Sequence, residues 1–141
     1  MLEYLRPWVD LYKVDLKSFD DRHYHQLGGR LQPILDTIRR LHEMDFWLEI
    51  VTLVIPGFND SDDELQRLTE FIASVSTDIP WHATAFHKDY KMTDPDNTSA
   101  EILMRAGKSA GNQACATSMP GICRARLGTW RTHVVTAASN C

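Results

Sequence analysis

The sequence lacks the features that mark several large classes of protein. Its 141 residues include only three cysteines, Cys115, Cys123 and Cys141, whose spacing matches neither a zinc site nor a redox motif. No stretch approaches the roughly 18 apolar residues that a membrane-spanning helix needs. The net charge of −4 provides no basic surface for nucleic acid or for an anionic membrane. We therefore expect a globular domain that binds neither nucleic acid nor membrane.

Signatures of common enzymes and of secretion are also missing. The histidines lack the H-x-x-E-H and H-E-x-x-H spacings of zinc enzymes, and neither a P-loop nor a G-x-S-x-G motif occurs. No metal-ligating set can therefore be assigned. The amino-terminal residues, MLEYLRPWVD, show no basic stretch followed by an apolar one, so we expect no signal peptide and a cytoplasmic protein.

The chain does contain an alternation of strand-like and helix-like segments. Strands are predicted at Val9–Lys17, Phe46–Ile55 and Trp81–His87. The second is nearly continuous in apolar residues, which is typical of a strand covered on both faces. Helices are predicted from Ser18 or Asp20 to about Leu27, over Leu31–Met44, from a Ser61–Glu64 capping box to about Ser76, and over Ser99–Ala106. This order indicates an α/β fold with a parallel sheet, and three strands cannot close an eight-stranded barrel.

The chain changes character after about Gly107. Residues 108–141 show neither helical nor strand periodicity and hold all three cysteines. A structureless segment of that length is uncommon in a compact domain. We therefore predict a structured domain over residues 1–107, followed by an irregular tail.

Charged side chains occupy the end of the first predicted strand. Lys13, Asp15 and Lys17 share one face, because strand side chains alternate with a period of two. They fit an edge strand with a wet face or an internal Asp–Lys pair. They also fit a ligand site, since ligands of α/β folds bind beyond the carboxyl ends of parallel strands. His87 and Pro56-Gly57 end the other two strands at the same edge, although a single histidine there is more often structural.

Three motifs occur in a familiar order along the chain. YKVDLKSFDDRHYHQLGG, FWLEIVTLVIPGFND and PWHATAFHKDYKM resemble the later half of a radical S-adenosylmethionine (SAM) enzyme. The resemblance is to the AmmeMemoRadiSam-system type, which is related to the pyruvate formate-lyase activating enzymes, and it covers about Val9–Gly107. It implies the C-terminal half of a partial (β/α) barrel, whose strand ends bind SAM beside a 4Fe-4S cluster.

The resemblance also implies roles for five residues. Asp15 and Lys17 would contact the methionyl part of SAM or a nearby cation, and Lys17 suits a carboxylate because its ammonium is a compact cation on a flexible stem. His87 would contact the same ligand. Gly57 and Asn59, in VIPGFN, would border the adenosyl group. The resemblance assigns no catalytic residue to this chain.

Two departures from the family pattern limit what the chain can do. The family holds its cluster with a C-x-x-x-C-x-x-C loop after the first strand, which this sequence lacks. The first half of the barrel is missing too, and Ala85 stands where relatives are expected to carry a basic residue. The chain is therefore predicted to be a fragment that does not cleave SAM by itself. The parent enzyme would generate a 5′-deoxyadenosyl radical for an unknown substrate, and the relation to activating enzymes suggests a protein.

The tail admits a specific hypothesis. A shifted reading of codons for residues 118–133 permits Y-A-G-N-L-P-G followed by a cysteine pair, which resembles the ending expected for the family. We therefore predict a frameshift in or just after Arg105–Gly111, which would leave the three cysteines without a role. Two alternatives remain at this point: a non-catalytic α/β module that binds a small anion through Lys17 and His87, and an inert truncated product.

Overall fold

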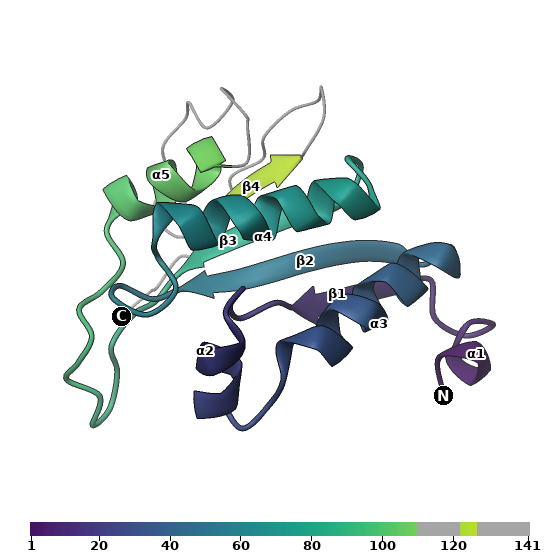
Figure 1. Ribbon diagram of the computed structural model, residues 1–141, viewed down its shortest axis with the longest axis horizontal. Coiled ribbons are helices and arrows are strands. Elements are labelled where there is room, and N and C mark those ends of the chain that lie inside the picture. Colours follow the sequence, from purple (N-terminus) through teal and green to yellow (C-terminus); the bar gives the residue numbers. More distant parts are fainter. Residues whose placement is uncertain (110–121, 127–141) are drawn as a thin grey trace.

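The computed structural model describes residues 1–109 and the backbone of residues 122–126. Three strands, β1 (Leu11–Asp15), β2 (Trp47–Val54) and β3 (Pro80–Ala85), lie side by side in a parallel sheet. A fourth strand, β4 (Ile122–Arg126), runs antiparallel along β3, so the sheet has the order β1-β2-β3-β4 (Figure 1). The predicted α/β fold with parallel strands is confirmed.

Five helices accompany these strands in the described part of the chain: α1 (Leu2–Leu5), α2 (Asp21–Gln26), α3 (Leu31–Glu43), α4 (Asp62–Val75) and α5 (Ala100–Ser109). All but the short α1 match predicted helices. The buried side chains of α3 and α4 recur at three- and four-residue spacing, as the periodicity indicated. None of these helices is long and apolar enough to cross a membrane.

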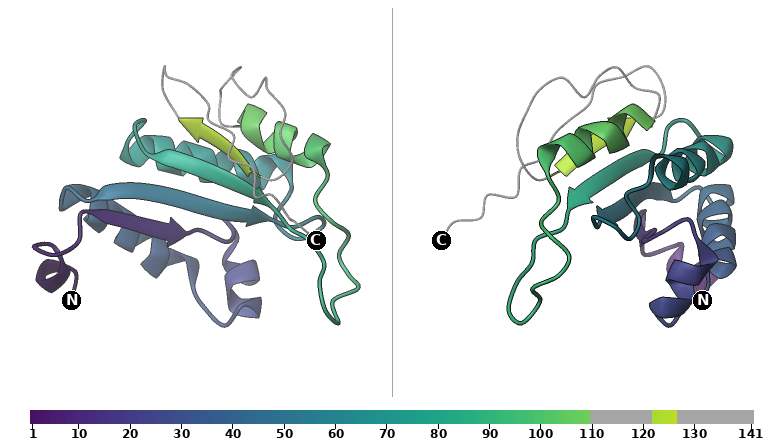
Figure 2. Two further views of the ribbon diagram at one scale, coloured as in Figure 1. Left: turned by 180° about the vertical axis from the view of Figure 1, so that it is seen from behind. Right: turned by 60° about the vertical axis from the view of Figure 1, so that its left-hand side comes forward.

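Helices α3, α4 and α5 pack on one face of the sheet, which differs from the prediction that the second strand is covered on both faces. Along β2 the buried side chains alternate with partly exposed ones, and Trp47 is 51% exposed. The buried set of β2 shares one core with α3, α4 and α5, and these helices lie on the same side of the sheet (Figure 2). The continuous apolar run was therefore wrongly interpreted as cover on both faces: within the described residues only one face carries helices. The sequence of β2 is nearly continuous in apolar residues because its face away from the helices also carries apolar side chains.

The register of the strands sets the edge at which they end. Asp15 pairs with Val51, and Val54 pairs with Ala85, so β1 ends three residues before β2 does. β1 is also shorter than the predicted Val9–Lys17, and at its carboxyl end the backbone N–H of Lys17 donates to the Tyr24 hydroxyl instead of continuing a ladder. We call the carboxyl-end edge of β1, β2 and β3 the rim.

One strand lies inside the segment that was predicted to be irregular. Ile122–Arg126 forms β4 and pairs by its backbone with residues 80–84. Residues 108 and 109 belong to α5, and residues 110–121 and 127–141 of the tail lie outside the described residues. The frameshift hypothesis for it therefore stays a prediction.

Candidate functional site

Asp15 and Lys17 lie at the rim and pair with each other. The Lys17 Nζ is 2.6 Å from the Asp15 Oδ2, and both side chains are about half exposed. β1 is the edge strand of the described sheet. The arrangement therefore combines the two interpretations of the sequence: an Asp–Lys pair on a wet edge strand, located at the strand end where α/β folds bind ligands.

The turn after β2 requires glycine at residue 57. Gly57 has a φ of +73°, in the left-handed region that L-residues with side chains avoid. A Cβ added there would meet no atom within 4 Å. Its N–H donates to the Asp60 Oδ1 at 2.8 Å. The structure thus demands glycine for its backbone conformation and leaves the space above the turn open.

Asn59 lies beneath this turn and joins two strand ends. Its side chain is buried, with 1% of the residue exposed. The Asn59 Oδ1 accepts from the Ile55 N–H at 2.7 Å, while its Nδ2 donates to the carbonyls of Lys17 at 2.5 Å and Leu53 at 2.8 Å. Both amide hydrogens are thereby used. The geometry favours a positioning role for Asn59 over contact with a ligand.

His87 follows β3 and is exposed. Because Val54 pairs with Ala85, His87 leaves the sheet level with the turn that contains Gly57. Thr98 joins these two strand ends: its hydroxyl donates to the Val54 carbonyl at 2.6 Å and accepts from the Phe86 N–H at 2.9 Å. Sequence reasoning did not identify Thr98.

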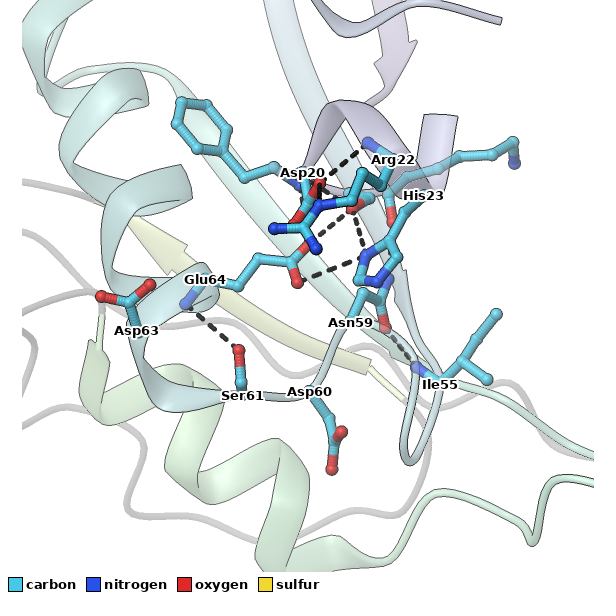
Figure 3. A network of polar contacts seen from close by, with 12 residues as sticks. Asp20, Arg22, His23, Ile55, Asn59, Asp60, Ser61, Asp63 and Glu64 are labelled. Carbon is cyan, nitrogen blue, oxygen red and sulfur yellow. Dashed lines mark hydrogen bonds and ion pairs between the residues drawn. The ribbon is translucent and has the colours of Figure 1, made fainter. Parts of the chain in front are cut away.

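A buried carboxylate lies behind the turn that follows β1 (Figure 3). Glu64 is 4% exposed; its Oε1 accepts from the Phe19 N–H at 2.8 Å and from the Ser18 hydroxyl. The Glu64 Oε2 is 3.5 Å from the His23 Nδ1, and the His23 ring stacks on Phe58 at 4.4 Å between centroids. This network joins α4 to α2 and to the end of β1.

The predicted Ser61–Glu64 capping box is therefore only half formed. The Ser61 Oγ accepts from the Glu64 N–H at 3.3 Å and caps α4 as expected. In a full capping box the glutamate side chain would return to the N-cap backbone. Here it instead bonds the turn after β1. The sequence offered no signal for this, because its partners are more than 40 positions away.

Two groups near the rim have shifted proton affinities. Burial raises the pKa of the Tyr24 hydroxyl above its ordinary value of 10.0, although the N–H of Lys17 opposes this shift. The Arg22 backbone N–H lowers the pKa of Asp20, the N-cap of α2. Both shifts belong to groups that hold α2 and the turn after β1 in place.

A second polar pair lies on the sheet face opposite the helices. The His82 Nε2 is 3.1 Å from the Glu49 Oε2, and both side chains are mostly buried. They come from adjacent strands, β3 and β2, and the register places Lys13 of β1 opposite Glu49. No group of three or more His, Cys, Asp or Glu residues within the described part of the chain could hold a metal ion.

A shallow cavity lies at the opposite edge of the sheet, away from these residues. Its lining includes His42, Trp47, Asp78 and Pro80, at the amino ends of β2 and β3. It is thus separate from the rim, where the strand ends, the Asp15–Lys17 pair and the Gly57 turn meet. The molecule is thus an α/β protein whose rim is the edge at which ligands of such folds bind.

Comparison with known proteins relates this sheet to one group of enzymes. The chain is 31% identical over 99 residues to an uncharacterized protein of Methanocaldococcus jannaschii, and this alignment covers 70% of this chain and 30% of that protein. It is 33% identical over 118 residues to the pyruvate formate-lyase-activating enzyme of Staphylococcus aureus, and this alignment covers 73% of this chain and 47% of that enzyme. The chain is thus homologous to a pyruvate formate-lyase-activating enzyme. No family model matches it.

The fold comparison agrees with the sequence comparison. The structure resembles the crystal structure of a domain of pyruvate formate-lyase-activating enzyme from Bacteroides vulgatus, with a TM-score of 0.61. The match has 23% identity and covers 77% of this chain and 65% of that one. The chain spans less than half the length of the two curated relatives described above. The homology supports the radical SAM superfamily, whereas the AmmeMemoRadiSam subtype stays a prediction.

Proposed function

We propose that this chain is the SAM-binding part of a radical SAM enzyme of the activating type. Lys17 would receive the methionyl carboxylate of SAM, beside Asp15, and His87 would contact the same ligand. The turn around Gly57, supported by Asn59, would border the adenosyl group. The observation that carries the proposal is the half-exposed Lys17 ammonium at the rim of a chain homologous to an activating enzyme.

The residues present fit SAM better than they fit the iron–sulfur cluster. A lysine ammonium suits a carboxylate, and the space above the Gly57 turn is open to a ligand. The cluster would need cysteine thiolates, and residues 1–109 contain no cysteine. In the superfamily the cluster supplies the electron that cleaves SAM. No step of that reaction is therefore assigned to side chains of this chain, whose part is to bind and orient SAM.

The homology also suggests the class of substrate. The Staphylococcus aureus relative is named as the activating enzyme of another enzyme, pyruvate formate-lyase. We infer by analogy that the parent of this chain acts on a protein. The cytoplasmic location expected from the sequence belongs to the same proposal.

Equilibrium dialysis with radiolabelled SAM tests the proposed site. A charge-assisted hydrogen bond is worth about 1.5–3 kcal/mol, so Lys17→Met should weaken SAM binding by roughly tenfold to a hundredfold. Lys13→Met is the matched control, since Lys13 is exposed on the same strand face two residues before Asp15; it should change the affinity less than about twofold.

Either of two results would contradict the proposal. The wild-type chain could fail to bind SAM, or Lys17→Met could bind it as tightly as the wild type does. Binding of inorganic phosphate that depends on Lys17 and His87, without binding of SAM, would instead support a small-anion-binding module.

A further inference from the structure

The turn between β1 and α2 is held by side chains from other elements. Residues 17–20 belong to neither element. The Lys17 N–H donates to the Tyr24 hydroxyl at 3.0 Å, and the Lys17 carbonyl accepts from the Asn59 Nδ2 at 2.5 Å. The next two residues, Ser18 and Phe19, both donate to the Glu64 Oε1. The turn is thus tied to α4 immediately after the residue that carries the rim ammonium.

The burial of Glu64 needs an explanation, because taking a carboxylate out of water is costly unless its oxygens accept hydrogen bonds. Helix capping alone does not explain it. Asp62 and Asp63 occupy the same first turn of α4, and their exposed carboxylates already complement the helix dipole. What Glu64 adds is a set of bonds to the turn after β1, 45 and 46 positions away in the chain.

The hydrogen bonds around Ser18 indicate where the protons of Ser18 and His23 lie. The single Ser18 hydroxyl hydrogen points to Glu64, so the Ser18 oxygen must accept from its other two neighbours. These are the Asp20 N–H at 3.1 Å and the His23 Nδ1 at 3.0 Å. His23 therefore carries a proton on Nδ1, and this proton also faces the Glu64 Oε2. The carboxylate thus accepts from Ser18 and Phe19 and faces the His23 proton.

We propose that Glu64 is a positioning residue for the rim: by holding Ser18 and Phe19, it fixes the backbone of Lys17 and so the ammonium that receives the ligand. This inference rests on the proposed SAM site. It predicts that loss of the Glu64 oxygens leaves the Phe19 N–H and the Ser18 hydroxyl without acceptors. The turn then loosens, and the ligand loses a preorganised contact.

Two substitutions and a control separate positioning from general stability. Glu64→Leu removes both acceptor oxygens at similar size. Glu64→Gln keeps one oxygen for Ser18 and Phe19, and its amide NH2 replaces only the Oε2, which faces the His23 Nδ1 at 3.5 Å without a hydrogen bond. It should therefore rescue most of the effect. Asp63→Asn is the matched control, because Asp63 lies one position earlier and its exposed carboxylate pairs with Arg67 at 2.9 Å.

The experiment uses the full chain and two readouts. Amide hydrogen exchange, followed by NMR, compares Lys17 and Phe19 at the turn with Ile50 in the core of β2. Equilibrium dialysis measures the Kd for SAM. In Glu64→Leu we expect faster exchange at Lys17 and Phe19, unchanged exchange at Ile50, and SAM binding weakened by about tenfold. In Glu64→Gln the Kd should rise by no more than about threefold, and Asp63→Asn should match the wild type.

The two readouts also separate this inference from the proposed function. Wild-type affinity for SAM in Glu64→Leu, or unchanged exchange at Lys17, overturns the positioning role and leaves the SAM site standing. If the wild-type chain does not bind SAM, the proposed function fails. Exchange at Lys17 then decides the positioning role: faster exchange in Glu64→Leu supports it, and unchanged exchange refutes it.

Should Glu64→Leu not fold, Ser18→Ala removes one donor of the network and leaves the buried carboxylate with the Phe19 N–H. We then expect faster exchange at Lys17 and SAM binding weakened by about threefold. Wild-type behaviour of Ser18→Ala in both readouts would overturn the proposal.

Discussion

Asn59 offers the sharpest test of how the rim is built. Its buried amide makes three hydrogen bonds to the backbone, one with the Ile55 N–H and two with the carbonyls of Lys17, just after β1, and Leu53, near the end of β2. A hydrogen bond of this kind contributes about 1 kcal/mol net. Asn59→Ala should therefore lower the free energy of unfolding by about 3 kcal/mol, a large part of the roughly 5–15 kcal/mol that is typical of a whole domain.

Asn59→Asp sharpens the prediction. An aspartate keeps the oxygen that accepts from the Ile55 N–H but turns a second oxygen toward the carbonyls of Lys17 and Leu53. The charged form is therefore disfavoured in the folded state, and the pKa of the introduced carboxyl is raised. Stability is then greatest below its unfolded pKa of about 3.9 and is lost as the pH rises through the folded pKa. At pH 7 this variant should be at least as unstable as Asn59→Ala.

Urea denaturation followed by circular dichroism measures both variants at pH 5 and pH 7. Asn97→Ala serves as the control, because the Asn97 Oδ1 accepts one exposed hydrogen bond, from the Lys88 N–H at 2.8 Å. It should cost less than about 1 kcal/mol. A loss below about 1 kcal/mol in Asn59→Ala would refute the reasoning, as would an Asn59→Asp variant whose stability does not fall between pH 5 and pH 7.

Two further predictions concern Tyr24 and Gly57. Burial raises the pKa of the Tyr24 hydroxyl above 10.0, so its contribution to stability is complete below about pH 10 and is lost as the pH rises through the folded pKa. Tyr24→Phe should therefore cost about 1 kcal/mol of unfolding free energy at pH 7 and should lose less stability than the wild type between pH 9 and pH 11.5. Denaturation over this pH range measures both, and an equal alkaline loss in the two proteins would exclude Tyr24 as its source. Gly57→Ala should lower the unfolding free energy by about 1–2 kcal/mol from the positive φ alone, because an added Cβ meets no atom within 4 Å. Thermal denaturation measures this cost, and a loss above about 4 kcal/mol would reveal a steric clash that this geometry lacks.

The order of strands and helices could be predicted from the sequence because it depends on local patterns. The apolar stripe of Leu31–Met44 and the apolar run of Phe46–Ile55 each lie within one element, so α3 and β2 were located to within one residue or so. The Ser61 cap and the strand end at Pro56-Gly57 are local in the same sense. The placement of Lys17 and Gly57 near one edge followed from the rule that parallel strands end together.

The contacts that build the rim could not be predicted, because they depend on which distant residues the fold brings together. Glu64 was interpreted as a capping residue, and only the packing of α4 beside the end of β1 places its carboxylate on Ser18 and Phe19. Asn59 was expected to face a ligand, but the pairing of β1 with β2 buries its amide between two strand ends. Period and propensity describe single segments, whereas the burial of a polar side chain depends on acceptors and donors that other segments supply.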